Sequence, residues 1–168
     1  MKFHYKGNIK KLKTAVYRAN LICEMKEFYA DIASVRDFDL DNTTPTKISM
    51  ELKYSPGLIF VKTYYRPFSR ANAYFKPSQP EYIFINTAKL RRSINSIVNT
   101  IVHEGVHVVD HNVEDASFGH AGNTSHGKGE TAPYKIGMLA QIRAEYYYPT
   151  PKILSRWQRF KNFLRRTI

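Results

Sequence analysis

Apolar side chains recur every three or four residues in four parts of the chain, which is the spacing of one face of an amphipathic helix. In the third part, Thr131 stands where an N-cap residue would and Pro133 lies in the first turn. Two further prolines, Pro149 and Pro151, end this pattern. The predicted helices span residues 8–34, 90–112, 131–147 and 152–166.

Between the first two of these helices, the pattern changes to short β-branched and aromatic runs bounded by Pro, Gly and Ser. A segment rich in Asp, Asn, Thr and Pro, 36–46, is predicted to be a loop, and a second irregular segment spans 114–130. The predicted strands span residues 47–54, 58–65, 72–75 and 81–86. Strands followed by helices predict an α+β fold with a small mixed or antiparallel sheet and flanking helices.

The length of 168 residues and the mass of 19.5 kDa fit one domain over residues 1–168. Apolar residues make up 43% and charged residues 24%, which argues against a disordered chain or a coiled coil. No apolar run approaches the roughly 18 residues of a membrane span, and no apolar stretch follows the basic start. The single cysteine, Cys23, excludes an internal disulfide framework. We therefore expect a reduced, cytoplasmic protein.

The formal net charge is +12, and the excess lies at the two ends of the chain. Residues 1–18 contain six basic side chains and no acid, and residues 152–168 contain another six, again without an acid. The residues between them carry 14 basic and 14 acidic groups. Such ends attract a polyanion, either nucleic acid or, as the less favoured partner, an anionic membrane surface. The alternative is two solvated helix faces that only keep the protein in solution.

The sequence HEGVH at residues 103–107 lies on the second predicted helix. Four residues advance a helix by about 400°, so His103 and His107 share a face about 6 Å apart along the axis. Both imidazoles can then reach one zinc ion at about 2.0–2.1 Å. Glu104 lies one step round the helix, where it can act as a general base toward water without binding the metal. His111 extends the stripe but lies about 12 Å from His103, too far for the same ion.

This arrangement resembles the zincin metallopeptidases, in which helix histidines bind the metal, the intervening Glu is the general base and a third ligand follows. The predicted strand 81–86 is similar to the zincin edge strand, which binds extended substrate by β-addition. The resemblance covers about residues 81–134. It implies a zincin-like α+β fold, with 90–112 as the active-site helix and Zn²⁺ as the cofactor.

The resemblance leaves three residues open as the third ligand. A Gly-His loop after the active-site helix is similar to that of the SprT-like zincins, and this favours His120. His126 and Glu130 remain as alternatives. The metzincin pattern does not fit, because Asp110 and Val113 occupy the positions where it has Gly and His.

The resemblance thus implies a zinc-dependent peptidase that acts on protein or peptide substrates. His103, His107 and His120 would bind Zn²⁺. Glu104 would take a proton from the attacking water and return it to the leaving amine. Tyr134 could donate a hydrogen bond to a developing oxyanion, but a packed aromatic residue is the favoured interpretation.

A second hypothesis belongs to a different class. The chain would be a basic nucleic-acid-binding protein whose zinc site is structural or vestigial. Aromatic residues lie among the basic residues of the last predicted helix, which suits phosphate contact combined with base stacking. Loss of hydrolysis in a Glu104→Gln protein would separate the two hypotheses.

Overall fold

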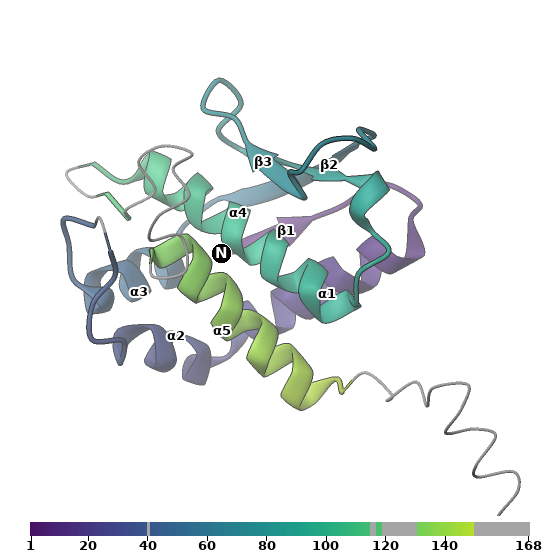
Figure 1. Cartoon of the computed structure of the whole chain (residues 1–168). Helices are drawn as coiled ribbons and strands as arrows, with labels where there is room; N and C mark the ends of the chain where they lie inside the picture. The colour runs from purple at the N-terminus through teal and green to yellow at the C-terminus, as the bar shows by residue number, and fades with distance from the viewer. Residues whose placement is uncertain (40, 115–116, 119–130, 150–168) are drawn as a thin grey trace, which may run out of the picture.

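Four short strands and five helices make up the parts of the chain that the computed structural model describes, which are residues 1–39, 41–114, 117–118 and 131–149 (Figure 1). In chain order the elements are β1 (Lys2–His4), α1 (Lys10–Glu24), α2 (Lys26–Ala33), α3 (Pro45–Tyr54), β2 (Leu58–Tyr64), β3 (Ala73–Phe75), β4 (Tyr82–Asn86), the short 3-10 helix η1 (Thr87–Lys89), α4 (Ile94–Asn112) and α5 (Ala132–Tyr147). The predicted α+β class is confirmed. No helix among the described residues is long and apolar enough to cross a membrane.

The four strands form one mixed sheet in the order β1-β2-β4-β3. β1, β2 and β4 are parallel to their neighbours, and β3 runs antiparallel to β4. Figure 1 shows the helices on one side of this sheet, with α4 against β3 and β4 and α1 against β1. α5 packs along α4 on the side away from the sheet. α4 is therefore enclosed between the sheet and the other helices.

The sheet order corrects the prediction that residues 81–86 form the edge strand. β4 lies inside the sheet, paired with β2 on one side and β3 on the other. The edge beside α4 is instead β3, the shortest of the strands that were predicted. Strand order depends on pairing between distant segments, and the periodicity of one segment carries no information on it.

Residues 47–54 are helical, so the predicted strand there is wrong. Thr44 caps the helix by accepting a hydrogen bond from the Lys47 N–H at 3.2 Å, and a proline follows in the first turn. Ile48 and Leu52 are buried at i and i+4, whereas Met50 between them is 55% exposed. Apolar residues at 48, 50 and 52 alternate as in a strand, but residues 48 and 52 also lie about one helical turn apart. The cap and the tertiary packing select the helix.

The predicted helix over 8–34 is two helices, because the chain breaks at Met25. Met25 has extended backbone angles, φ −76° and ψ 127°. The Tyr29 hydroxyl donates to the Cys23 carbonyl oxygen at 2.7 Å, which satisfies an acceptor left free at the end of α1. No Gly or Pro marks the position in the sequence. The break therefore arises from packing and not from a local breaker.

β1 is a strand that the sequence analysis missed. Only three residues long, it pairs with β2, from which it is separated by more than fifty residues. The Asn20 side chain on α1 covers the outer backbone of Phe3, accepting from its N–H at 2.7 Å and donating to its carbonyl oxygen at 2.9 Å. This edge of the sheet is thereby closed to a further strand.

The other predicted elements that fall within the described residues are confirmed. Strands at 58–65, 72–75 and 81–86, the helices at 90–112 and 131–147 and the loop at 36–46 are confirmed to within a few residues, apart from Leu40, which is not among the described residues. Ser93 caps α4 by accepting from the Ser96 N–H at 3.1 Å. The predicted helix 152–166, which carries the basic C-terminal end, lies outside the described residues.

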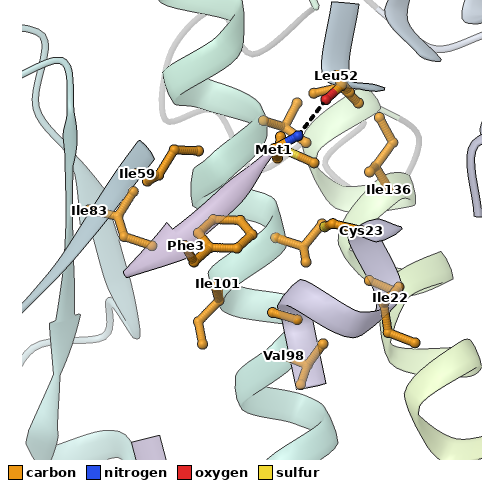
Figure 2. Close-up of a cluster of buried hydrophobic side chains, with 14 of the residues drawn as sticks. Met1, Phe3, Ile22, Cys23, Leu52, Ile59, Ile83, Val98, Ile101 and Ile136 are labelled. Carbon is orange, nitrogen blue, oxygen red and sulfur yellow. Dashed lines mark hydrogen bonds between the residues drawn. The ribbon is translucent and has the colours of Figure 1, made fainter. Parts of the chain in front are cut away.

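The core joins the inner face of the sheet to α4 and α1. Figure 2 shows Phe3 of β1 among Ile59 and Ile83 of the sheet and Val98 and Ile101 of α4. The same view shows the Met1 ammonium group donating to the Leu52 carbonyl oxygen at 2.7 Å. β1 thus packs over the middle of α4.

This packing requires a glycine at position 105. A Cβ atom added to Gly105 would lie 2.6 Å from Cζ of Phe3 and 3.4 Å from Sδ of Met1. We expect Gly105→Ala to lower the free energy of unfolding by up to about 2 kcal/mol. Overpacking costs about 1–3 kcal/mol, and the better helix propensity of Ala offsets about 1 kcal/mol. Urea unfolding in the presence of a chelator measures this change.

Gly57→Ala is the matched control, because nothing lies within 4 Å of the position that its Cβ would take. This variant should be as stable as the wild type or slightly more stable. Equal stability of Gly105→Ala and the wild type would show that the contact with Phe3 does not constrain α4.

Candidate metal centre

α4 carries the candidate site on its central turns. The helix is buried over most of its length, since it contacts the sheet on one side and α1 and α5 on the other. His103 and His107 are partly buried and Glu104 is only 7% exposed. Buried ionisable side chains in the middle of an apolar helix are costly unless the surroundings or a ligand compensate for them. Their presence here makes this part of α4 a candidate functional site.

The two histidines point their ring nitrogens at the same place. Nε2 of His103 and Nε2 of His107 lie 3.3 Å apart, and the ring centroids are 5.0 Å apart. Two ligands, each about 2.0–2.1 Å from one tetrahedral zinc ion, lie about 3.3 Å from each other. The separation in this structure therefore fits a shared zinc ion.

Glu104 lies beside these rings but in a drier environment. Its carboxylate accepts a hydrogen bond from the backbone N–H of Phe75 on β3. Burial raises the pKa of Glu104 to about 8, and the hydrogen bond from Phe75 opposes this rise. A carboxyl group with a pKa near neutrality can both accept and release a proton at physiological pH.

The edge strand β3 forms one wall of the site. The ring of Phe75 lies 6.5 Å from that of His107, nearly parallel to it, and 5.5 Å from that of His111. The Asn86 N–H donates to the Asn72 carbonyl oxygen at 2.9 Å, so these two residues are a hydrogen-bonded pair between β3 and β4.

Paired and outward positions alternate along antiparallel strands. Since Asn72 faces β4, the backbone groups of Ala73 and Phe75 face the outer edge of β3, and Tyr74 faces β4 again. The hydrogen bond from the Phe75 N–H to Glu104 agrees with this assignment, because it needs a Phe75 N–H that faces away from β4. The general-base candidate therefore lies at the outer edge of the sheet.

α5 forms the opposite wall. The ring of Tyr134 meets that of His103 edge-on, with a centroid separation of 4.5 Å. A Cβ atom at Gly137 would lie 3.0 Å from the Asn99 carbonyl oxygen and 3.2 Å from Cβ of His103. This close approach brings Tyr134 against His103. Burial, followed by the charge of Glu104, raises the pKa of the Tyr134 hydroxyl.

Asp110 fixes the chain after α4. Its Oδ1 accepts a hydrogen bond from the Phe118 N–H at 2.8 Å, and Phe118 is fully buried. The neighbouring Ser117 N–H donates to Oδ1 of Asn42 at 2.6 Å. The chain therefore enters the segment 119–130 from a point anchored one turn beyond His107.

The structure brings together three of the predicted site residues, His103, Glu104 and His107. The predicted third ligand, His120, and its alternatives His126 and Glu130 lie outside the described residues. Within the described ranges, no group of three His, Cys, Asp or Glu side chains is placed to hold a metal ion.

Tyr134, for which a packed aromatic residue was the favoured interpretation and a hydrogen-bond donor the alternative, packs edge-on against His103. Sequence reasoning missed two other groups that interact with Glu104. Tyr64 was not considered, but the charge of Glu104 contributes to the raised pKa of its hydroxyl, after burial and Tyr74. Phe75 acts through its backbone N–H, which no side-chain motif can reveal.

The burial of Glu104 predicts how the stability of the metal-free protein changes with pH. Because the pKa is about 8 in the folded state and 4.5 for a glutamate carboxyl group in water, the folded state binds the proton more tightly. The resulting stability is complete below about pH 4.5 and is lost as the pH rises through 8. Each tenfold change in proton affinity corresponds to about 1.4 kcal/mol, so the loss amounts to a few kcal/mol.

Glu104→Gln should abolish this dependence. Urea unfolding of both proteins in the presence of a chelator, from pH 5 to pH 8.5, measures the difference between their free energies of unfolding. As the pH rises, the free energy of unfolding of the variant should increase relative to that of the wild type. A constant difference would mean that the carboxyl is ionised throughout the range.

Known proteins do not identify the chain. No family model matches it, and neither the curated proteins nor the solved structures contain a match. The function is therefore argued from the arrangement of His103, Glu104 and His107 and from the elements that hold them.

Proposed function

We propose that this chain is a zinc-dependent peptidase of zincin-like fold. The observation that carries the proposal is the 3.3 Å separation of the His103 and His107 Nε2 atoms, beside a buried carboxyl group on the same helix. Two aligned nitrogen ligands suit zinc, and a carboxylate one step round the helix suits a base and not a ligand. His120 is the third ligand in this proposal, since the chain leading to it is anchored at Asp110, close to His107.

Zinc held by His103, His107 and His120 would supply Lewis acidity for the substrate carbonyl group and for a water molecule. Glu104 takes one proton from the attacking water as the new carbon–oxygen bond forms. It then delivers that proton to the amide nitrogen as the carbon–nitrogen bond breaks. The products are a carboxylic acid and an amine. The raised pKa of Glu104 suits both transfers.

The edge of β3 provides the binding surface for an extended peptide. The outward backbone groups of Ala73 and the carbonyl oxygen of Phe75 can pair with a substrate strand, whereas the Phe75 N–H already donates to Glu104 at that edge. The opposite edge of the sheet is closed by Asn20. β-Addition is therefore assigned to β3 and no longer to residues 81–86.

Tyr134 is positioned to assist. Its ring lies against His103, and the charge of Glu104 reaches its hydroxyl group. A neutral phenol beside the metal ligands can donate a hydrogen bond to the oxygen on which negative charge develops. The raised pKa keeps the phenol protonated for that role.

Metal analysis gives the first test. Purified wild-type protein should contain about one zinc ion per chain, and His103→Ala or His107→Ala should lose nearly all of it, because two remaining protein ligands hold zinc poorly. His4→Ala is the matched control and should retain the metal, since His4 lies beside Phe60 on the face of the sheet that points away from α4. Wild-type protein without a transition metal, prepared without chelator, would overturn the proposal.

Hydrolysis gives the second test. Glu104→Gln should retain zinc but cleave denatured casein at least about 10²–10⁴-fold more slowly, the usual effect of losing a general base. The amide is nearly the size of the carboxyl group but accepts no proton. Glu81→Gln, an exposed glutamate before β4, is the control and should cleave casein like the wild type. Undiminished activity of the Glu104→Gln protein would remove Glu104 from the mechanism.

A further inference from the structure

The outer face of the sheet carries a continuous group of aromatic side chains. Along each strand, alternate residues point away from α4, and no described helix covers them (Figure 1). This aromatic face consists of His4, Phe60, Tyr64, Tyr74, Tyr82 and Phe84, with Lys62 among them. An uncovered sheet face normally carries polar side chains. An aromatic face is therefore a candidate binding surface.

The rings contact one another across all four strands. His4 meets Phe60 at a centroid distance of 5.9 Å, and Phe60 meets Tyr82 at 5.5 Å. On the other edge, Phe84 and Tyr74 are stacked, 4.9 Å apart with an interplanar angle of 11°.

Tyr64 lies 5.0 Å from Tyr74 and extends the face toward the end of β2. Tyr74 belongs to the edge strand and is 39% exposed, so part of its ring is accessible to a ligand. A planar ligand can therefore continue the stack at Tyr74.

The charge of this face is purely positive. The Lys62 ammonium group lies 3.7 Å from the centre of the Tyr82 ring and 6.0 Å from that of Phe84. Lys2 is exposed on the same face of β1. None of the outward side chains of the four strands is acidic.

We propose that the aromatic face binds single-stranded nucleic acid. Bases stack on the rings, beginning at Tyr74, and phosphates lie near Lys62 and Lys2. Every base presents an aromatic surface, so this mode of binding tolerates different sequences. It requires unpaired bases, because the bases of a duplex are already stacked on one another.

The charges argue against a second copy of the chain as the partner. Two copies meeting face to face would bring together two faces whose charged strand residues are all basic. A polyanion, in contrast, is complementary to this face and to a chain with a net charge of +12. The proposal is independent of the peptidase chemistry, since it uses the opposite face of the sheet.

Anisotropy of a labelled 12-nucleotide oligonucleotide, as DNA and as RNA, tests the proposal with the full chain. Tyr74→Ala should weaken binding about 5- to 100-fold, the effect of losing one stacked base. Lys62→Gln should lower the slope of log affinity against log salt by about 0.7 for each phosphate that the lysine neutralises in the wild type. Lys62 is exposed, so the second variant keeps the test valid if the first does not fold.

A second lysine and tyrosine pair on the surface supplies matched controls. The Lys53 ammonium group lies 5.1 Å from the centre of the Tyr54 ring on α3, and Tyr54 is 67% exposed. Tyr54→Ala and Lys53→Gln should bind the oligonucleotide like the wild type.

Several results would overturn the proposal. Equal binding by the wild type, Tyr74→Ala and Lys62→Gln would place the binding surface elsewhere. Tighter binding of a duplex than of a single strand would also contradict it. Binding only to anionic phospholipid vesicles, or no binding at low salt, would do the same. A selective loss in the Tyr74 and Lys62 variants supports it.

Discussion

Close contact between α4 and its neighbours on both sides is the constraint on which the rest of the structure depends. On the sheet side, Phe3 occupies the space that a side chain at position 105 would need. On the α5 side, Gly137 allows the backbones of the two helices to approach at Asn99. Both contacts fall within two turns of the His103 and His107 pair. The same packing that forms the core thereby encloses the candidate metal centre.

Burial of Glu104 links stability to chemistry. A carboxyl group in an apolar environment resists ionisation, and this raises its pKa to about 8. An enclosed carboxyl group stabilises the metal-free protein only while it remains protonated. The burial that weakens the fold at neutral pH also gives the group the proton affinity that a general base requires. Functional sites commonly carry such a conflict with the rest of the fold.

β3 connects the two surfaces for which we propose functions. Its alternate residues face opposite sides of the sheet, so Phe75 lies against His107 while Tyr74 lies on the aromatic face. The backbone of the strand supplies the edge beside Glu104. Three residues thus contribute to the proposed peptidase site on one side and to the proposed nucleic-acid site on the other. A substrate bound at the edge would lie next to nucleic acid bound on the face.

Local patterns determined much of this protein. The spacing of His103 and His107 placed both on one face of a helix, because four residues make just over one helical turn. The β-branched and aromatic runs at 58–65 and 81–86 predicted two strands correctly. The sequence had no such signal for the break at Met25, the strand β1 or the interior position of β4. It also had none for the approach of the Phe75 N–H to Glu104. Residues 47–54 satisfied both periods, and packing decided between them. Periodicity reports only which side of an element is apolar, whereas strand order, helix breaks and backbone contacts arise from segments that are distant in the chain and meet only in the folded protein.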